Sequence, residues 1–422
     1  MNDTTLNAQK RRSQTDISLL ERWCRQMLFG QLKGLQGAHL VIEDSTGIHR
    51  FGRLVDDNNL NAHIQIHDPC AYRKIVFGGS VGAGEAYMQG IWTTPCLVAV
   101  VQVMARNLSV TRSLGKGWSL VHGAFNKCMH ALNANSLVGS KKNIAAHYDL
   151  GNNFFQLFLD PSLMYSAAIY SEEITGLDAA AEHKLETVCK KLKLTAEDHL
   201  LEIGTGWGGM AIYAAKNYGC RVTTTTLSKQ QFEFAQRAVE REGLEDQVTL
   251  LLKDYRELKG CYDKLVSIEM IEAVGHDYYD TYFEKCSSLL TSDGLMLIQA
   301  ITIADQRYHA AKSSVDFIQK YIFPGGGLPS NEVISSGVRR CTDMMIVDLH
   351  DIGWDYARTL NDWRKRFHDQ IDQVKAQGFD ERFCRMWDFY LAYCEGGFKE
   401  RVISTVQVVL AKPYAKQLPR RA

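Results

Sequence analysis

A glycine-rich turn between an apolar strand and a helix is the sharpest chemical signal in the chain. The segment reads LLEIGTGWGG at residues 200–209. Glycines adopt positive φ angles and let a ligand approach the backbone closely. A helix that starts directly after such a turn also offers unpaired backbone N–H groups to the ligand. The spacing therefore predicts a loop that binds a cofactor.

Two classes of ligand use such a turn. Dinucleotides bind GxGxxG with the pyrophosphate at the helix N-terminus, whereas S-adenosylmethionine (SAM) methyltransferases place an acidic-x-Gly-x-Gly-x-Gly loop around the amino-acid end of SAM. Glu202 would repel a pyrophosphate but suits the positively charged end of SAM. The next strand ends in Thr223–Thr226, where an NAD site expects Asp or Glu. These residues favour a methyltransferase over a dinucleotide enzyme, with a ligand-free glycine turn as the third alternative.

The elements around this turn have the pattern of an α/β sheet. Apolar strand-like runs alternate with helical periods, which is typical of a parallel sheet with helices on both faces. The expected strands are residues 199–204, 220–227, 247–254, 263–270 and 294–301. The expected helices between them include residues 209–216 and 229–242. The glycine turn follows the first of these strands.

The first third of the chain has a different texture. Apolar residues at helical spacing predict a helix at Asp16–Leu28 and a second helix from about Leu97 to Leu108. Short strands are expected between residues 38 and 67. Residues 113–140 lack a strong pattern and are interpreted as a connection. The predicted organisation is an N-terminal domain (1–122), a linker (123–142) and a catalytic domain (143–422).

The composition excludes several classes of protein. The chain has 422 residues with 48 Lys+Arg against 48 Asp+Glu, and this zero net charge argues against a nucleic-acid-binding protein. Its eleven cysteines lie singly without a CxxC pair, which argues against a metal site and favours reduced thiols in the cytoplasm. The N-terminus lacks the apolar stretch of a signal peptide, and no apolar run reaches the roughly 20 residues of a membrane span. We expect a cytoplasmic protein that is at most peripheral to the membrane.

Motifs spread over residues 70–410 resemble the cyclopropane fatty acid synthase family, SAM-dependent enzymes that act on unsaturated acyl chains. The motifs are GEAYMQGIW (84–92), HYDLGNNFF (147–155), MYSAAIY (164–170), LEIGTGWGG (201–209), TLSKQQ (226–231), KDYREL (253–258), EAVGHDYYDTYF (272–283), KYIFPGGGLPS (320–330) and YCEGGFKERVISTVQV (393–408). The resemblance implies an α/β fold: a Rossmann-like class I SAM-dependent methyltransferase domain with extra helices, preceded by a small α+β N-terminal domain.

The resemblance also implies where SAM binds. Besides Glu202, the cofactor-binding positions of the family fall on Tyr148, Tyr165, Ser166, Gly204, Gly206, Gly208, Thr226, Gln231, Asp254 and Tyr255. The residue types suit this role. Thr226 and Gln231 can hydrogen-bond ribose hydroxyls, and Asp254 can accept a hydrogen bond from the adenine amino group.

The resemblance further implies how the reaction proceeds. A cis double bond attacks the SAM methyl group, and the resulting carbocation loses a proton from that methyl group as it closes to a cyclopropane. A bound bicarbonate takes the proton in this family, held by a Cys, a Glu, a His, an Ile backbone N–H and a Tyr. In this chain these positions fall on Ala167, Glu272, Gln299, Ile301 and Tyr356, in that order. Because Gln299 cannot become cationic or relay a proton, we expect the bicarbonate site to be weaker, reshaped or absent.

Several functions stay open at this point. With bicarbonate bound, the product is a cyclopropane fatty acid. Alternatively, Glu272 or Tyr356 takes a different proton and the product is a methyl-branched or methylene fatty acid. Gln299 and Ala167, together with Ala273 at the family's usual His after the Glu, motivate this alternative. Further alternatives are another methyl acceptor and a non-catalytic lipid-binding protein on a methyltransferase fold.

A phospholipid substrate implies transient contact with the inner face of a membrane. Residues 10–12 (Lys-Arg-Arg) precede the first amphipathic helix, and Lys412, Lys416, Arg420 and Arg421 lie near the end of the chain. Such basic clusters attract anionic lipid at about 1 kcal/mol per charge, and an ordinary solvated tail is the alternative. With such a substrate, we expect the N-terminal domain (1–122) to serve lipid docking or dimerisation. The family resemblance implies a homodimer formed through this domain.

Overall fold

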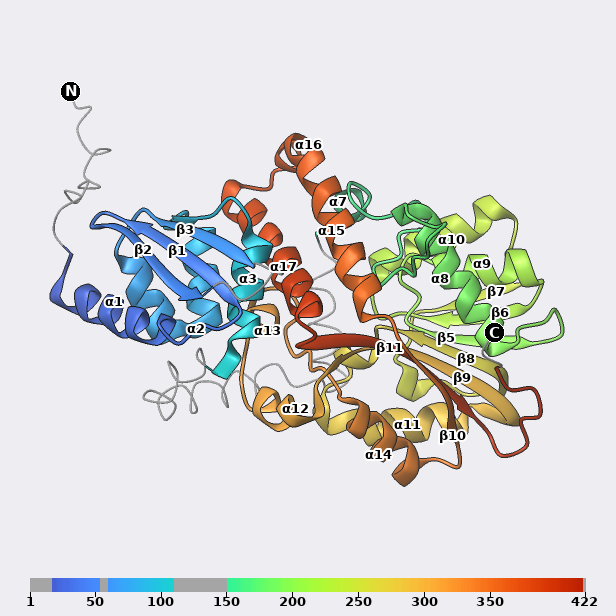
Figure 1. The fold of residues 1–422 in the computed structure, drawn as a ribbon. Coiled ribbons are helices and arrows are strands. Elements are labelled where there is room, and N and C mark those ends of the chain that lie inside the picture. Colours follow the sequence, from blue (N-terminus) through green and yellow to red (C-terminus); the bar gives the residue numbers. More distant parts are fainter. Residues whose placement is uncertain (1–16, 54–59, 110–149, 420–422) are drawn as a thin grey trace. The chain divides into compact units, whose positions relative to one another are not determined.

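The computed structural model of the chain describes residues 17–53, 60–109 and 150–419 (Figure 1). The chain divides into two compact units. The first contains the residues up to Ser119 together with Arg385–Phe389, and the second contains Leu120–Cys384 and Tyr390–Ala422. The predicted linker 123–142, Tyr148 and the basic residues at 10–12 and 420–421 lie outside the described residues.

The first unit is built around a four-stranded sheet. Its elements are α1 (Leu19–Leu32), β1 (Ala38–Asp44), β2 (Gly47–Arg53), β3 (Asn61–Ile66), α2 (Cys70–Met88), β4 (Trp92–Thr93) and α3 (Leu97–Arg106). The strands pair in the order β2-β1-β3-β4, with β1 and β3 parallel and the other neighbours antiparallel. Side chains alternate across a strand, so β1 buries Ala38, Leu40 and Ile42 on one face. The predicted mixture of helix and strand is present in this region.

The first helix begins later than predicted. α1 starts at Leu19 rather than at Asp16, because Ser18 caps it. The Ser18 hydroxyl accepts a hydrogen bond from the Glu21 N–H at 3.2 Å, and the Glu21 carboxylate accepts one from the Ser18 N–H at 3.0 Å. This reciprocal pair is the capping box. The helix also continues past the predicted end to Leu32, which is buried.

The second unit carries a seven-stranded sheet. Its first elements, up to β8, are α7 (Asn152–Phe155), α8 (Leu177–Leu192), β5 (His199–Ile203), α9 (Gly209–Tyr218), β6 (Arg221–Thr225), α10 (Lys229–Glu242), β7 (Val248–Leu251), the 3-10 helix η2 (Tyr255–Glu257) and β8 (Tyr262–Ile268). After them come η3 (Ile271–Ala273), η4 (His276–Tyr278), α11 (Tyr279–Ser288), β9 (Leu290–Ile303), α12 (Asp305–Lys312), α13 (Phe317–Tyr321), α14 (Asn331–Cys341), β10 (Met345–Asp351), α15 (Gly353–Asp369), α16 (Ile371–Ala376), α17 (Glu381–Lys399) and β11 (Ile403–Ala411).

The sheet is parallel in its predicted part and antiparallel at one edge. The strand order is β10-β11-β9-β8-β5-β6-β7. All pairs from β9 to β7 are parallel, as the sequence predicts. β11 pairs antiparallel with β9 and with β10, and neither of these two strands was among the expected ones.

Helices cover both faces of this sheet (Figure 1). On one face, Leu201 of β5 and Met296 of β9 pack in a core with residues of α11 and α14. On the other face, the adjacent Leu200 and Leu297 pack with residues of α8 and α9. This change of face between neighbouring residues follows from the two-residue period of a strand. The arrangement confirms the predicted parallel sheet with helices on both faces.

One edge of the sheet gathers the chemistry-bearing residues. The carboxyl ends of parallel strands lie at the same edge, which is where ligands bind in open α/β sheets. Along the chain, the residues at this edge are the glycine loop after β5, Thr226 after β6, Asp254 after β7, Glu269 and Glu272 after β8, and Gln299 and Ile301 near the carboxyl end of β9.

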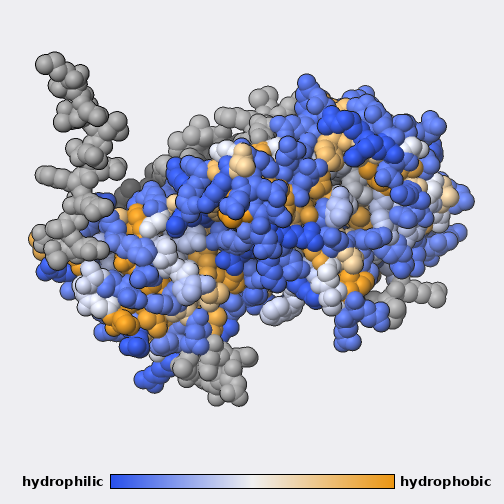
Figure 2. Space-filling model, turned by 90° about the horizontal axis from the view of Figure 1, so that it is seen from above, coloured by the Kyte–Doolittle hydropathy of each residue, from blue (hydrophilic) through white to orange (hydrophobic). Residues whose placement is uncertain are grey.

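The face shown in Figure 2 is largely hydrophilic, with its apolar residues in separate patches. Among the described residues, no helix is both long enough and apolar enough to cross a membrane. The exposed large apolar side chains include Leu19, Leu20 and Trp23 of α1.

Candidate active site

The glycine loop after β5 has an open apex. Gly204, Gly206 and Gly208 have φ angles of 103°, 54° and 94°, a region that favours glycine. The N–H groups of Gly204 and Thr205 donate to the carbonyl of Thr225 at 3.0 and 3.1 Å, which anchors the loop to β6. A Cβ placed on Gly206 would meet no atom within 4 Å. The loop therefore leaves its backbone accessible to a ligand just before α9 begins.

Glu202 lies in β5, two residues before Gly204, with its side chain buried. It accepts a hydrogen bond from the Thr224 hydroxyl at 2.6 Å. Burial raises the pKa of Glu202 to about 8, and the positive charge of Lys184 opposes this shift. The carboxyl group is thus hydrogen-bonded to the neighbouring strand β6. Its contact with SAM stays a prediction.

Thr226 and Gln231 form the predicted pair after β6. The Thr226 hydroxyl donates to Oε1 of Gln231 at 2.9 Å, and both side chains are buried. The Ser228 hydroxyl caps α10 by accepting a hydrogen bond from the Gln231 N–H at 3.3 Å. This bond fixes the position of Gln231 in the first turn of the helix. This places a hydroxyl and an amide together at the edge of the sheet that carries the glycine loop.

Asp254 follows β7 and is held by a residue that the sequence reasoning missed. Arg256 donates to it from Nε at 2.8 Å and from Nη2 at 2.7 Å, a two-point ion pair. Asp254 is buried, and it also accepts from the Arg256 backbone N–H at 3.0 Å as the cap of η2. Tyr255, the first residue of that turn, is buried beside it. Arg256 lies within the KDYREL motif, so this motif was the available signal.

The segment around Tyr165 is tied to the interior of the second unit. The Tyr165 and Tyr390 hydroxyl groups are 2.8 Å apart, and the Ser166 hydroxyl accepts from Nζ of Lys184 at 3.1 Å. Lys184 is fully buried, and burial lowers the pKa of its ammonium group to about 8. Nothing in the sequence points to a buried Lys184, because a lysine on an amphipathic helix is ordinarily a surface residue.

Glu272 lies in η3, beyond the carboxyl end of β8. Its Oε1 accepts a hydrogen bond from the Ile301 N–H of β9. Its Oε2 is buried and has no hydrogen-bond partner within the described ranges. Burial first, and then the neighbouring charge of Glu269, raise the pKa of Glu272 to about 8. Glu272 therefore carries a proton over much of the neutral pH range.

A second carboxylate, Glu269, stands beside Glu272 and was not predicted. It accepts three hydrogen bonds: from the Ala167 N–H at 2.8 Å, from Nε2 of Gln299 at 2.9 Å and from the Tyr356 hydroxyl at 2.8 Å. The family motif matches Glu272 alone. The sequence SIEMIEAVG (267–275), with two glutamates three residues apart after a strand, held the signal.

Gln299 is oriented by a partner on the antiparallel edge. Gln407 of β11 lies opposite Gln299 in the register and donates from Nε2 to its Oε1 at 3.0 Å. The amide nitrogen of Gln299 is thereby turned toward Glu269 and toward the Ala167 carbonyl, at 2.9 and 3.2 Å. Gln299 acts as a fixed neutral donor to a carboxylate.

The groups expected to hold bicarbonate are therefore already engaged. Three of them, the N–H of Ala167 and the side chains of Gln299 and Tyr356, donate to Glu269, and the Ile301 N–H donates to Glu272. Glu272 itself, the fifth group, offers at most one O–H donor when it is protonated, which by itself is too few to hold an anion. The residues present do not fit a bound bicarbonate.

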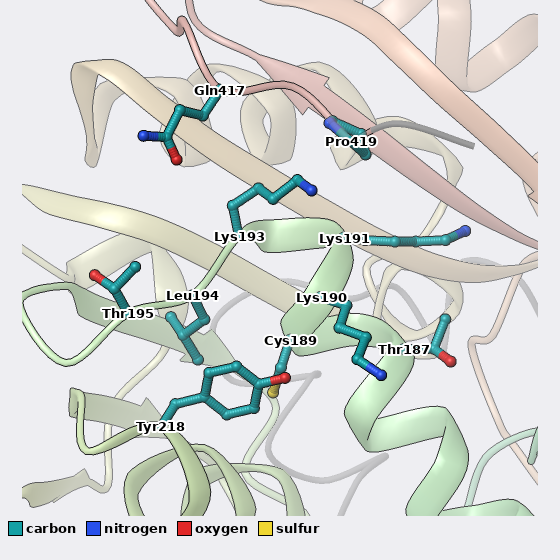
Figure 3. A pocket seen from close by; sticks show the side chains of 10 residues that line it. All are labelled: Thr187, Cys189, Lys190, Lys191, Lys193, Leu194, Thr195, Tyr218, Gln417 and Pro419. Carbon is teal, nitrogen blue, oxygen red and sulfur yellow. The ribbon is translucent and has the colours of Figure 1, made fainter. Parts of the chain in front are cut away.

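A surface hollow of about 630 Å³ lies elsewhere in the second unit (Figure 3). It is lined by the end of α8, including Lys190 and Lys193, and by Gln417 and Pro419 near the end of the chain. The end of α8 leads into the amino end of β5, whereas the glycine loop lies at the carboxyl end of that strand. Because parallel sheets bind ligands at the carboxyl ends of their strands, we do not place the active site in this hollow.

Comparison with known proteins agrees with the geometry at the carboxyl edge. A family profile described as mycolic acid cyclopropane synthetase matches residues 136–408. The chain is 36% identical over 355 residues to the cyclopropane-fatty-acyl-phospholipid synthase of Escherichia coli K12. The aligned region covers 83% of this chain and 88% of that one. The chain belongs to the cyclopropane synthase family.

Two further comparisons extend this assignment. The chain is 38% identical over 357 residues to the tuberculostearic acid methyltransferase UfaA1 of Mycobacterium tuberculosis, with 82% of each chain covered. It matches the structure of mycolic acid cyclopropane synthase CmaA1 in complex with SAH and CTAB, with a TM-score of 0.60 and 30% identity over 64% of this chain and 98% of that one. The predicted class I SAM-dependent methyltransferase fold is confirmed.

Cyclopropane synthases are SAM-dependent methyltransferases, and this protein is one. The residues at the carboxyl edge fit SAM. The open apex of the glycine loop leaves room for the amino-acid end, and the buried Thr226–Gln231 pair and Asp254 offer hydrogen-bonding groups to the ribose and the adenine. SAM, when bound there, supplies an electrophilic methyl group. The individual contacts remain predictions of the sequence.

A substitution at Asp254 tests this placement. Asp254→Asn removes the charge that Arg256 pairs with and weakens the acceptor offered to the adenine amino group. We expect the Kd for SAM to rise about tenfold, which corresponds to about 1.4 kcal/mol, measured by isothermal titration calorimetry. Asp246→Asn, at an exposed position just before β7, is the matched control and should leave the Kd unchanged. An unchanged Kd in Asp254→Asn would contradict the placement of the adenine.

Proposed function

We propose that this cyclopropane synthase homologue transfers the methyl group of SAM to the cis double bond of unsaturated fatty acyl chains in membrane phospholipids, and that the product is a cyclopropane fatty acyl chain. The family assignment supports the reaction class. The observation that carries the proposal is the acidic centre of Glu269 and Glu272, which adjoins a group of aromatic rings at the carboxyl edge of the sheet.

Tyr356 connects the acidic centre to these rings. Its hydroxyl donates to Glu269, while its ring stacks on Phe398 with centroids 4.6 Å apart and meets Trp363 edge-on at 6.0 Å. The Trp363 ring lies 5.3 Å from Tyr165, the predicted cofactor residue. Aromatic faces and carboxylates both favour positive charge nearby. The surroundings thus suit a reaction that passes through a carbocation on the acyl chain.

The residues of this chain contribute mainly by positioning and by excluding water. An alkene is a weak nucleophile, so holding its double bond in line with the methyl group supplies much of the rate. Tyr356 and Trp363 are buried, with 5% and 0% of their surface exposed. Buried aromatic side chains exclude water, which would otherwise react with the cation. A carboxylate at the acidic centre then accepts the proton that the cation loses.

Product analysis tests the proposed function. Purified protein is incubated with SAM and vesicles of cis-monounsaturated phospholipid, and the fatty acids are identified by gas chromatography and mass spectrometry. We expect a fatty acid heavier by one CH2 that has lost its double bond. Tyr356→Phe removes the hydroxyl bonded to Glu269 and should slow the reaction at least tenfold. Tyr414→Phe, at an exposed tyrosine, should not change the rate.

Two outcomes of this experiment would contradict the proposal. A methylated product that keeps a double bond would support the methyl-branched or methylene alternative. SAM binding without any methylated lipid would support a non-catalytic lipid-binding protein on a methyltransferase fold.

We also propose that α1 docks the protein transiently on the inner face of the membrane. Leu19, Leu20 and Trp23 are 83%, 45% and 45% exposed. Trp23 follows Leu20 by three residues and Leu19 by four, so it lies next to both on the helix surface. Exposed Arg22 stands next to them and suits anionic head groups. At the other end of the chain, Lys412 donates to Asp343 at 2.6 Å, so it is engaged within the second unit rather than available to lipid.

Vesicle co-sedimentation tests the role of α1. The double substitution Leu19→Ser and Trp23→Ser removes two apolar side chains, each worth about 1.5–3 kcal/mol when buried. We expect binding to anionic vesicles to fall at least tenfold at moderate salt. Ile48→Ser is the matched control, because Ile48 is an exposed apolar residue of β2 in the same unit. Equal loss in both variants would contradict a specific role of α1.

The family resemblance also leads us to propose a homodimer through the first unit. Sedimentation equilibrium of the full chain should give twice the monomer mass of 47.6 kDa. A monomer at micromolar concentration would contradict this proposal.

A further inference from the structure

We infer that the carboxylate of Glu269 is the base that accepts the proton lost by the acyl cation, in the place where the family uses bicarbonate. The inference rests on the proposed function and names a catalytic residue for it. Glu269 directly follows β8, three residues before Glu272, which is the glutamate that matches the family.

The donors around Glu269 are the first observation. Oε1 accepts from the Ala167 N–H and from Nε2 of Gln299, and Oε2 accepts from the Tyr356 hydroxyl, all between 2.8 and 2.9 Å. These are three of the groups that the family resemblance assigns to bicarbonate. A carboxylate and a bicarbonate present the same planar, negatively charged O–C–O group, so the same donors can serve one or the other. Here the protein itself supplies the anion.

The backbone of Glu269 is the second observation. Its φ angle is +49°, in the left-handed region that favours glycine. Holding a non-glycine residue there costs about 1–3 kcal/mol, and such strain persists where the surroundings fix it, most often at active sites. The N–H of Glu269 donates to the Gln299 carbonyl at 2.7 Å and holds this conformation. The chain thus keeps a glutamate where a glycine would be less strained.

The neighbouring carboxyl group supports an ionised Glu269. One donor, the Ile301 N–H, faces Glu272, whereas three donors face Glu269. Burial raises the pKa of both groups, and the charge of Glu269 raises the pKa of Glu272 further. The buried Lys184 ammonium lies close enough to favour the ionised form of Glu269. When two adjacent carboxyl groups keep one proton, it resides on the one with fewer donors, which is Glu272.

The proton transfer balances without a further reactant. Each carboxylate oxygen has two lone pairs. Oε1 of Glu269 uses both on its two donors, while Oε2 meets Tyr356 alone among the described residues and keeps one lone pair. A C–H bond of the newly attached methyl group breaks, and its electron pair forms the ring bond to the cationic carbon. The proton adds to Oε2 of Glu269 and later passes to solvent.

Chemical rescue with bicarbonate tests the inference. The wild-type protein, Glu269→Gly and Glu269→Gln are assayed on phospholipid vesicles in CO2-depleted buffer, with and without added bicarbonate. We expect the wild type to be indifferent to bicarbonate. Glu269→Gly should lose at least about 100-fold in kcat, the scale of a general base, and regain several-fold with bicarbonate, because its three donors are free. Glu269→Gln should stay inactive in both buffers, because its amide fills the site.

Controls separate catalysis from folding. Glycine at position 269 relieves the backbone, so the melting temperature of Glu269→Gly should not fall and its Kd for SAM should stay the same. Lys193→Gly relieves a similar left-handed residue, with φ +52°, at the end of α8, and it should keep wild-type activity in both buffers. A wild type that needs bicarbonate, or a Glu269→Gly variant that keeps its rate without bicarbonate, would overturn the inference.

A binding measurement keeps the inference testable even if the substrate is different. Titration of the SAM-loaded protein with 13C-bicarbonate, followed by NMR, should show no binding to the wild type and binding to Glu269→Gly. Bicarbonate binding to the wild type would overturn the role of Glu269 whatever the acceptor is. Failure of vesicle methylation together with this binding pattern would overturn the proposed substrate and leave the carboxylate in the place of bicarbonate.

Discussion

The parallel pairing of β8 with β9 is the constraint on which the active centre depends. Ile268 lies opposite Gln299 in this pair, so Glu269 and Glu272, which follow β8, lie beside the last residues of β9. The antiparallel pairing of β11 then sets Gln407 against Gln299 and fixes the direction of its amide. A slip of one residue between these strands would turn Gln299 to the other face of the sheet. The hydrogen bonds of the acidic centre therefore follow from strand register.

Buried charge is the second property that organises the centre. Glu202, Glu272 and Lys184 all have pKa values near 8, each shifted by burial toward its neutral form. Isolated ions would be too costly in this interior, so each group is hydrogen-bonded, shares a proton or lies near an opposite charge. Glu269, which lies beside Glu272, accepts three hydrogen bonds, whereas Glu202 and Glu272 accept one each from the residues described here. This is the physical reason why we assign the negative charge, and with it the proposed role of base, to Glu269.

Local patterns in the sequence predicted much of the fold. The helix at 229–242 has the predicted bounds, and each predicted strand of the parallel sheet is present within a few residues. β10 escaped prediction because its residues are mostly exposed and have no apolar period. The predicted start of α1 at Asp16 was wrong, because Ser18 forms a capping box with Glu21 and the helix begins after it.

The sequence by itself determined the glycine loop, the class of cofactor and the family, because these depend on residue types at short spacing. It also showed that the bicarbonate positions had changed at Ala167 and Gln299. Only the tertiary structure decided what fills that place. Ala167, Glu269, Gln299 and Tyr356 lie far apart in the chain, and their contacts arise from a loop, two strand ends and a helix that meet at one edge of the sheet. Such contacts are set by register and packing, which spacing along the sequence does not contain.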